Sequence, residues 1–92
     1  TRTFQAIRIV VNGELEGLDE ALRDAAASLN LNGVLAVLSY HSGEDRAVKR
    51  AFRDLAGDGY VELTKKPVTP SEEEVRRNPR SRSAKLRALQ RR

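Results

Sequence analysis

The feature that most constrains the fold of this chain is an uninterrupted apolar run in its middle, residues 34–40, with the sequence Val-Leu-Ala-Val-Leu-Ser-Tyr. The run does not alternate between apolar and polar residues, as a strand with one solvated face would. A short continuous run after the turn signal Asn32-Gly33 is typical of a strand that is covered on both faces. Such strands belong to parallel sheets with helices on either side, so the run predicts an α/β fold.

The chain after this run predicts a helix, a strand, a short helix and a last strand. Ser42 has N-cap chemistry for a helix over residues 42–55, and a second strand is predicted over residues 60–64. The sequence Ser-Glu-Glu-Glu from Ser71 is a capping box for a short helix that must end near Asn78-Pro79. Residues 83–89 alternate in character, which predicts a final edge-type or antiparallel strand.

The first third of the chain has two interpretations. Asn12-Gly13 is a hairpin turn signal after the β-branched residues 7–11, whereas residues 14–29 keep a helical period. We favour one long helix from Phe4, with a bend at Gly13 or Gly17, over the hairpin. The helical stripe consists of apolar residues three and four apart: Phe4, Ile7, Val11, Leu15, Leu18, Leu22, Ala25 and Leu29.

The size of the chain limits it to one small domain or a piece of a larger one, since it has 92 residues. Three predicted strands form only a narrow sheet, which does not supply all the neighbours that a buried central strand needs. We therefore expect the chain to be a fragment. The absence of Cys excludes disulfides and thiolate metal sites, and a single His argues against a His-based metal cage. No apolar run is long enough to span a membrane, and the first residues do not have the layout of a signal peptide.

The net charge of +4 hides an uneven distribution. Residues 1–74 hold nine basic residues and all thirteen acidic ones, a net charge of −4, whereas residues 75–92 hold eight basic residues and no acid. A segment with a charge of +8 is either a solvated basic tail or a surface that binds a polyanion.

Three segments carry candidate functional side chains. Residues 39–42, Ser-Tyr-His-Ser, follow the buried strand, where open α/β sheets bind ligands; the alternative is a capped turn. Residues 78–83, Asn-Pro-Arg-Ser-Arg-Ser, offer donors to phosphate or a base edge; the alternative is an exposed basic loop. A Ser-His hydrolase is disfavoured because the strand-to-helix turn lacks Gly-x-Ser-x-Gly. The third segment is a helix face that carries the cations Arg46, Lys49, Arg50 and Arg53, which could contact nucleic acid. The alternative is an ordinary solvated surface, in which Asp45 and Lys49 form an i,i+4 ion pair.

Four ordered blocks of residues match one known pattern. They are residues 1–15 (Thr-Arg-Thr-Phe-Gln-Ala-Ile-Arg-Ile, then Val11-Asn12 and Glu14-Leu15), residues 40–50 (Tyr-His-Ser, Glu-Asp-Arg and Val-Lys-Arg), residues 63–67 (Leu-Thr-Lys-Lys-Pro) and residues 78–87 (Asn-Pro-Arg-Ser-Arg-Ser-Ala-Lys-Leu-Arg). Together they resemble the C-terminal part of the RsmH (MraW) family, bacterial methyltransferases that use S-adenosylmethionine to methylate N4 of a cytosine in 16S ribosomal RNA. The chain departs from that family in Leu31-Asn32-Gly33, where relatives carry Pro-Gly-Gly, and in Gly43, where they carry Leu.

The resemblance implies the C-terminal half of a Rossmann-like class I methyltransferase fold. Residues 34–40 and 60–65 would be parallel strands, and residues 83–89 the antiparallel strand. The Gly-rich cofactor loop of the family precedes the matched blocks, so this segment alone is expected to be inactive. Residues 1–92 would then be the C-terminal segment of a methyltransferase domain, with a basic RNA-facing end at residues 75–92.

The resemblance also implies roles for particular residues. We expect Ser39, His41, Ser42, Asn78 and Arg80 to line the base side of the substrate pocket. We expect Arg46, Lys49, Arg50, Arg82, Lys85 and Arg87 to hold RNA phosphates, and the polar strip Gln5, Arg8 and Asn12 to face the same cleft. No metal site is expected, and no residue is assigned as the acceptor of the N4 proton.

Two other functions remain open. One is a non-catalytic RNA-binding or interaction domain that kept half of the fold and its basic end. The other is a chain that self-associates, for example as a homodimer, through an open sheet edge. We expect small-subunit ribosomal RNA as the partner, no contact with a membrane, and a location in the cytoplasm.

Overall fold

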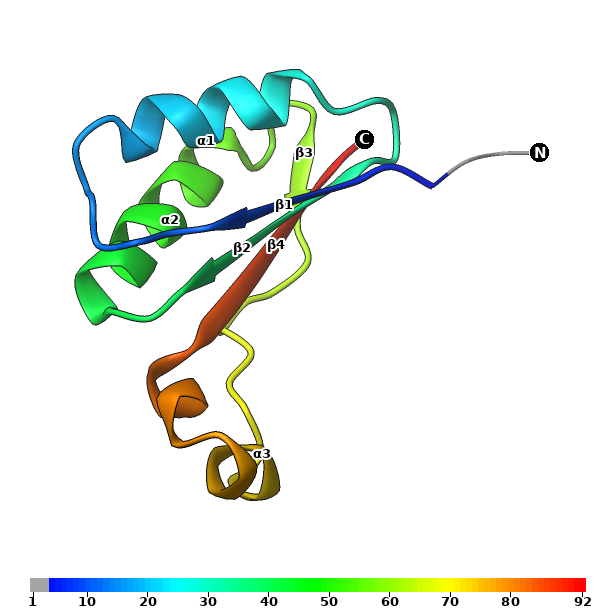
Figure 1. The fold of residues 1–92 in the computed structure, drawn as a ribbon. Coiled ribbons are helices and arrows are strands. Elements are labelled where there is room, and N and C mark those ends of the chain that lie inside the picture. The colour runs from blue at the N-terminus through cyan, green and yellow to red at the C-terminus, as the bar shows by residue number, and fades with distance from the viewer. Residues whose placement is uncertain (1–3) are drawn as a thin grey trace.

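The computed structural model describes residues 4–92, so the first three residues of the Thr-Arg-Thr-Phe block lie outside the described residues. The chain forms a four-stranded sheet in the order β1-β2-β4-β3. Helices α1 and α2 lie side by side on one face of this sheet (Figure 1). The bounds of the elements are β1 Ala6–Val10, α1 Leu18–Ala27, β2 Val34–Ser39, α2 Ser42–Leu55, β3 Tyr60–Glu62, α3 Glu72–Arg77, the 3-10 helix η1 Pro79–Ser83 and β4 Lys85–Arg91. The predicted α/β class is therefore confirmed.

The long N-terminal helix was a wrong prediction, because its first half is strand β1. Residues 6–10 pair in parallel with residues 34–38 of β2, so the hairpin is wrong as well. Gly13 and Gly17 have φ values of 81° and 75°, outside the right-handed helical region, and α1 begins only after Gly17. The apolar spacing from residue 4 to 15 fits a helix, yet the β-branched residues of this segment gain a partner strand that the helix would not offer. Of the residues in the stripe, only Leu18, Leu22 and Ala25 lie in α1, which ends at Ala27 before Leu29.

Gly17 provides a direct test of this difference. A Cβ at this position meets no atom within 4 Å, so only the backbone conformation decides the effect of Gly17→Ala. At φ 75° we expect the substitution to lower the free energy of unfolding by about 1 kcal/mol, whereas alanine in a continuous helix would raise it by about the same amount. Urea unfolding of the chain measures the sign, and Gly57→Ala, at φ 86° with equally free space, shows the size of the penalty in a turn.

The two remaining strand predictions hold, with shifted bounds. Strand β3 spans Tyr60–Glu62 instead of residues 60–64, and β4 starts two residues later than predicted. Strand β4 is antiparallel to both β2 and β3, so β2 and β3 run in the same direction with β4 between them. The last strand is thus antiparallel, as predicted, but it is an interior strand and not an edge. Its Leu89 is fully buried, which explains why an interior position suits it.

The core lies between the sheet and the two helices. Leu22 of α1, Phe52 of α2, and Leu35 and Leu89 of the sheet are almost fully buried. The helix predicted over residues 42–55 is confirmed, but its N-cap is His41 and not Ser42. The Nδ1 atom of His41 accepts a hydrogen bond from the Gly43 backbone N–H at 3.1 Å, which occupies a donor that every helix start leaves unpaired.

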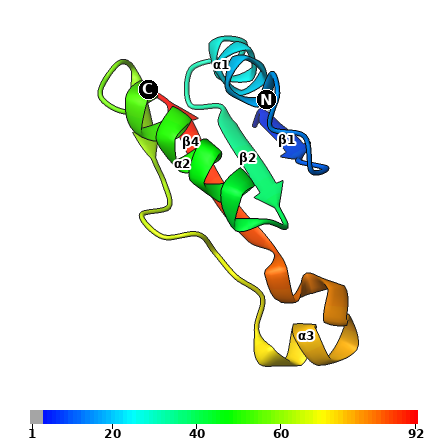
Figure 2. The same cartoon turned by 90° about the vertical axis from the view of Figure 1, so that its left-hand side faces the viewer.

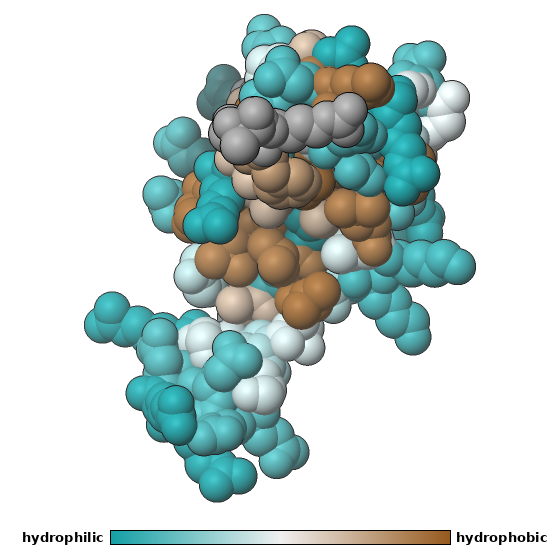
Figure 3. All heavy atoms as spheres, turned by 90° about the vertical axis from the view of Figure 1, so that its right-hand side faces the viewer, coloured by the Kyte–Doolittle hydropathy of each residue, from teal (hydrophilic) through white to brown (hydrophobic). Residues whose placement is uncertain are grey.

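The opposite face of the sheet is uncovered in the part of the chain that the structure describes. On β2, Leu35, Val37 and Ser39 are buried against the helices, while the alternate residues are only partly buried. The exposed Val10 of β1 is paired with Leu38 and extends this second face, and Figure 3 shows apolar surface on this side of the molecule. The prediction that residues 34–40 are covered on both faces is therefore wrong for residues 4–92. The outer edge of β1 has no partner strand among these residues, so self-association through an open edge stays a prediction.

Residues 71–83, which we call the arm, project from the body of the molecule (Figure 2). The predicted N-cap at Ser71 is confirmed, because its Oγ accepts from the Glu74 backbone N–H at 3.2 Å. The Glu74 carboxylate accepts from this same hydroxyl at 3.3 Å. Helix α3 ends at Arg77, as Asn78-Pro79 predicted, and η1 follows. The arm contains no buried residue in α3 or η1, and its surface is hydrophilic (Figure 3).

Candidate nucleic-acid interface

The candidate site lies at the end of the sheet where the parallel strands β1 and β2 finish. The Val11 backbone N–H donates to the Leu38 carbonyl at 2.9 Å, so the two strands end side by side. Glu44, which is 2% exposed, accepts from the backbone N–H groups of Gly13 at 2.5 Å and Tyr40 at 3.1 Å. One buried carboxylate therefore connects the loops that follow both strands. This end of a sheet is where open α/β folds bind ligands.

His41 and Ser42 are exposed at this end, between β2 and α2. Because Nδ1 of His41 accepts the hydrogen bond from Gly43, the neutral ring carries its proton on Nε2. Nε2–H has no partner among the described side chains, so it is free to donate to a ligand. The sequence left a capped turn and a ligand site as alternatives for this segment. The two are compatible, because Nδ1 of His41 caps the helix while Nε2 can contact a ligand.

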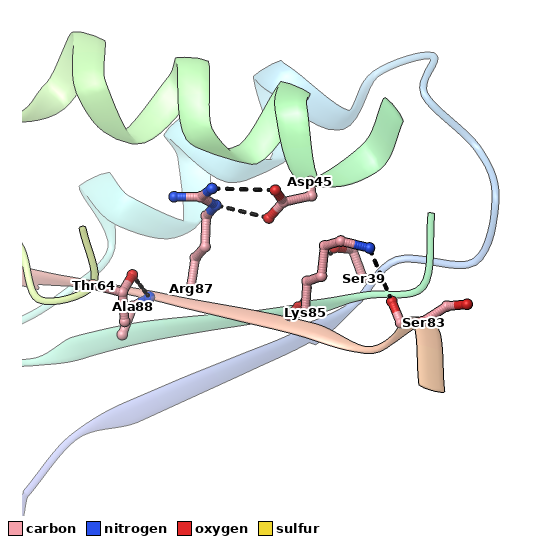
Figure 4. Close-up of polar contacts among 7 residues, drawn as sticks. All are labelled: Ser39, Asp45, Thr64, Ser83, Lys85, Arg87 and Ala88. Atoms are coloured by element: carbon pink, nitrogen blue, oxygen red, sulfur yellow. Dashed lines mark hydrogen bonds and ion pairs between the residues drawn. The ribbon is translucent and has the colours of Figure 1, made fainter. Parts of the chain in front are cut away.

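Ser39 has a different place from the one the resemblance implied. Its side chain points toward the helices and is 1% exposed, and its Oγ lies 3.5 Å from the Lys85 carbonyl (Figure 4). The hydroxyl therefore joins β2 to the start of β4. We remove Ser39 from the candidate pocket, because the alternation along β2 turns it to the buried face.

Arg87 is buried too, because its side chain is almost completely shielded from solvent. Its Nε donates to Oδ1 of Asp45 at 2.7 Å, and its Nη2 donates to Oδ2 at 3.1 Å (Figure 4). The side chain of Arg87 is 5% exposed and that of Asp45 is 14% exposed. We therefore remove Arg87 from the candidate phosphate contacts. The pair also corrects the expected Asp45–Lys49 ion pair, since the Asp45 carboxylate is held by Arg87.

The arm joins the sheet at this same end. Ser39 at the end of β2 is paired with Lys85 at the start of β4, so residues 40–42 and residues 78–84 leave the sheet together. Within the arm, Ser81 Oγ donates to the Asn78 carbonyl at 2.7 Å and fixes the turn that presents Arg80 and Arg82. Both arginines are exposed, and neither forms an ion pair within residues 4–92. Lys85 is partly buried, and its Nζ donates to the Ser83 carbonyl at 3.3 Å.

A second basic surface lies on the outer face of α2, and we call it the α2 basic face. It forms an open depression of about 260 Å³, and its only acidic lining residue, Asp54, accepts from Arg23 of α1 at 3.0 Å. Hydrogen bonds from Arg23 to Asp19 and to Asp54 raise the pKa of Arg23 above its ordinary value. No ion pair within the described chain involves the cations of the α2 basic face: Arg46, Lys49, Arg50 and Arg53.

Arg53 was not among the residues expected to hold phosphate, although its spacing of seven residues from Arg46 already indicated the same helix face. The polar strip of Gln5, Arg8 and Asn12 does not exist as such. Gln5 lies immediately before β1, and its Oε1 accepts a hydrogen bond from the Asn30 backbone N–H. Asn12 lies beyond the opposite end of the strand, with exposed Arg8 between them. A separation of three and seven residues aligns side chains on a helix but not on a strand.

Neither a metal cage nor a membrane-crossing helix is found within residues 4–92: no group of three His, Cys, Asp or Glu side chains is placed to hold an ion, and no helix is long and apolar enough to cross a bilayer. The segment also does not fit S-adenosylmethionine by itself. Gly13 and Gly17 flank an exposed loop, and Gly43 lies inside α2, so neither strand-to-helix connection has the Gly-rich turn that cradles such a cofactor.

The sheet order, with an antiparallel β4 between β2 and β3, agrees with the C-terminal part of a methyltransferase fold. The profile of the MraW methylase family matches residues 1–92, and the chain belongs to this family. It is 59% identical over 92 residues to the ribosomal RNA small subunit methyltransferase H of Koribacter versatilis. The proteins of the same name from Kosmotoga olearia and Anaplasma marginale are 57% and 55% identical over 91 residues.

These alignments cover 99% of this chain but only 29%, 30% and 31% of the three relatives. The chain therefore spans about three-tenths of the length of the curated relatives that it matches. Family membership and the methyltransferase fold are established for the segment by these matches.

Proposed function

We propose that this chain is part of an S-adenosylmethionine-dependent methyltransferase that methylates N4 of a cytosine in 16S ribosomal RNA. The segment supplies contacts on the substrate side. The observation that carries the proposal is the match of the whole chain to a family whose curated members are named ribosomal RNA small subunit methyltransferases. The exposed polar groups and unpaired cations at one end of the sheet agree with a role in holding RNA.

The chemistry of cytosine defines what this segment has to do. The lone pair of the exocyclic N4 is delocalised into the ring, so the amine is a poor nucleophile and positioning supplies much of the rate increase. A base in folded RNA must also leave its stack before its Watson–Crick edge can be read. S-adenosylmethionine, when bound by the complete enzyme, supplies the electrophilic methyl group.

The residues that we propose for the base side are His41, Ser42, Asn78 and Arg80. His41 offers Nε2–H as a donor, and cytosine presents acceptors at N3 and O2. Uracil carries a proton at N3, so a donor aimed at N3 would discriminate between the two pyrimidines. The α2 basic face, together with Arg82 and Lys85, is proposed to hold phosphates on either side of this position.

The test uses the complete protein, small ribosomal subunits that lack the modification, and labelled S-adenosylmethionine. Nucleoside mass spectrometry should find N4-methylcytidine. We expect His41→Asp to lower kcat/KM by about tenfold or more, because aspartate keeps the N-cap but has no donor. His41→Asn also keeps the cap and provides an N–H donor, so it should retain more activity.

Four results would contradict this function or the site proposed for it. Methylation on carbon 5 of the base would exclude the N4 reaction, and no methylation of any small-subunit RNA would exclude the enzyme. Equal activity in His41→Asp and the unmodified protein would remove His41 from the base side. RNA binding without methyl transfer by the complete protein would instead favour the non-catalytic RNA-binding domain.

A further inference from the structure

The inner face of α2 changes its chemistry along the helix. From Val48 onward it is apolar, and Val48, Ala51 and Phe52 are buried in the core. In the first turn it is acidic instead, with Glu44 at 2% exposure and Asp45 beside it. Apolar contacts hold a helix on a sheet without fixing its exact orientation, whereas hydrogen-bonded charges are directional. The directional contacts are concentrated at the end of α2 that carries His41 and Ser42.

The contact between Asp45 and Arg87 is the most specific of these. Both oxygens of the carboxylate are taken by two different nitrogens of one planar guanidinium, at 2.7 and 3.1 Å (Figure 4). The fork geometry fixes the direction of approach as well as the distance. The Asp45 backbone N–H also donates to the His41 carbonyl at 3.0 Å, so the Asp45 side chain is one helical turn away from the residue proposed to face the base.

Arg87 provides the other half of the arrangement. It lies on β4 two residues after Lys85, which is paired with Ser39 at the end of β2. Ala84 separates Lys85 from η1, which carries Arg80. The ion pair therefore connects the start of α2 to the strand from which the arm leaves the sheet. These are the two segments from which the proposed base-side residues come.

Stability alone does not account for a pair of this kind. Removing two charges from water is energetically costly, and well-packed apolar residues of similar volume often give equal or greater stability. What the apolar residues would not reproduce is the fixed direction of the contact. The pair therefore contributes geometry that apolar residues at the same positions would not.

We propose that Asp45 and Arg87 form a positioning pair that sets residues 40–42 relative to the start of β4 and the arm. This inference rests on the proposed function, because the geometry matters through the substrate pocket. Neither side chain contacts the substrate. Their role is exerted through His41 and Ser42 on one side and through Asn78 and Arg80 on the other.

The test is the apolar replacement Asp45→Leu/Arg87→Met in the complete protein. We expect the melting temperature to stay within a few degrees of the original. We expect kcat for methyl transfer to small ribosomal subunits to fall by about tenfold to a hundredfold, with KM for the RNA changed by less than about threefold. Amide hydrogen exchange in the peptide that covers residues 40–42 should accelerate at least tenfold, while residues 48–55 should stay protected.

The matched control is Val48→Ala, which loosens the apolar half of the same helix face. It should lower the melting temperature more than the double variant does, and kcat measured well below both transitions should stay within about twofold. Unchanged kcat in the double variant, or an equal loss of kcat in Val48→Ala, would overturn the positioning role. If the protein with its original sequence does not methylate the RNA, the proposed function is wrong. Unchanged hydrogen exchange at residues 40–42 of the double variant would overturn the positioning role independently of that result.

Discussion

Replacing Arg87 alone by methionine is expected to lower the free energy of unfolding by about 3 to 5 kcal/mol. The substitution leaves the Asp45 carboxylate, which is 14% exposed, without the guanidinium that occupies both of its oxygens. A buried charge without a partner is far more costly than no charge at all. Because folded domains are stable by only about 5 to 15 kcal/mol, this one change should unfold a large fraction of a marginal chain. Urea or thermal unfolding monitored by circular dichroism measures the loss.

Arg23→Met is the matched control for this prediction. Arg23 also pairs with carboxylates, at 2.8 Å to Asp19 and 3.0 Å to Asp54, but its side chain is 39% exposed. Exposed pairs of this kind contribute about 1 kcal/mol or less. An Arg87→Met variant that is no less stable than Arg23→Met would show that the Asp45 carboxylate is solvated. Adding Asp45→Leu to Arg87→Met should restore most of the lost stability.

The parts of the fold that the sequence predicts well are those with strong local signals. Residues 34–40 are apolar and follow Asn-Gly, α2 has an amphipathic period, and α3 has its own capping box, so each element is specified within its own segment. The N-terminal segment is different, because Ile7 and Val11 fit a helical stripe and a strand equally well. Its structure depends on pairing with β2, which lies 28 residues further along by the Ala6–Val34 register. A contact of that kind has no local signature.

The candidate site shows the same division between local and distant information. The spacing of Arg46, Lys49 and Arg50 predicts a shared helix face, and the structure places them in one depression. The resemblance implied that Arg82, Lys85 and Arg87 hold RNA phosphates, and Arg87 does not fit this expectation because its side chain is only 5% exposed. The sequence around Arg87, next to Leu86 on a predicted strand, does not indicate that an aspartate from α2 lies on the buried side of the sheet. Only the packing of α2 on β4 separates a structural arginine from the exposed ones.

The cations of the α2 basic face are expected to dominate the salt dependence of RNA binding by the complete protein. Each phosphate contact to a single strand contributes about 0.7 to the slope of log K against log salt. Replacing Arg46, Lys49 and Arg50 by glutamine should therefore lower the slope by about 2. These side chains form no ion pair in the part of the chain that the structure describes, so their replacement leaves no partner unsatisfied and the melting temperature should change little.

The control removes the same charge from a different surface, by replacing Lys65, Lys66 and Arg92 with glutamine. These residues are exposed, and Arg92 lies at the opposite end of β4 from the arm. If the RNA responds only to the net charge, both triple variants will change the slope equally, which would contradict a contact at the α2 basic face. If the RNA contacts the α2 basic face, only the triple variant of Arg46, Lys49 and Arg50 will lower the slope by about 2. Arg80→Gln/Arg82→Gln should then lower the slope by a further 1 to 1.5 or so, since the arm leaves the sheet beside the start of α2 and would hold separate phosphates.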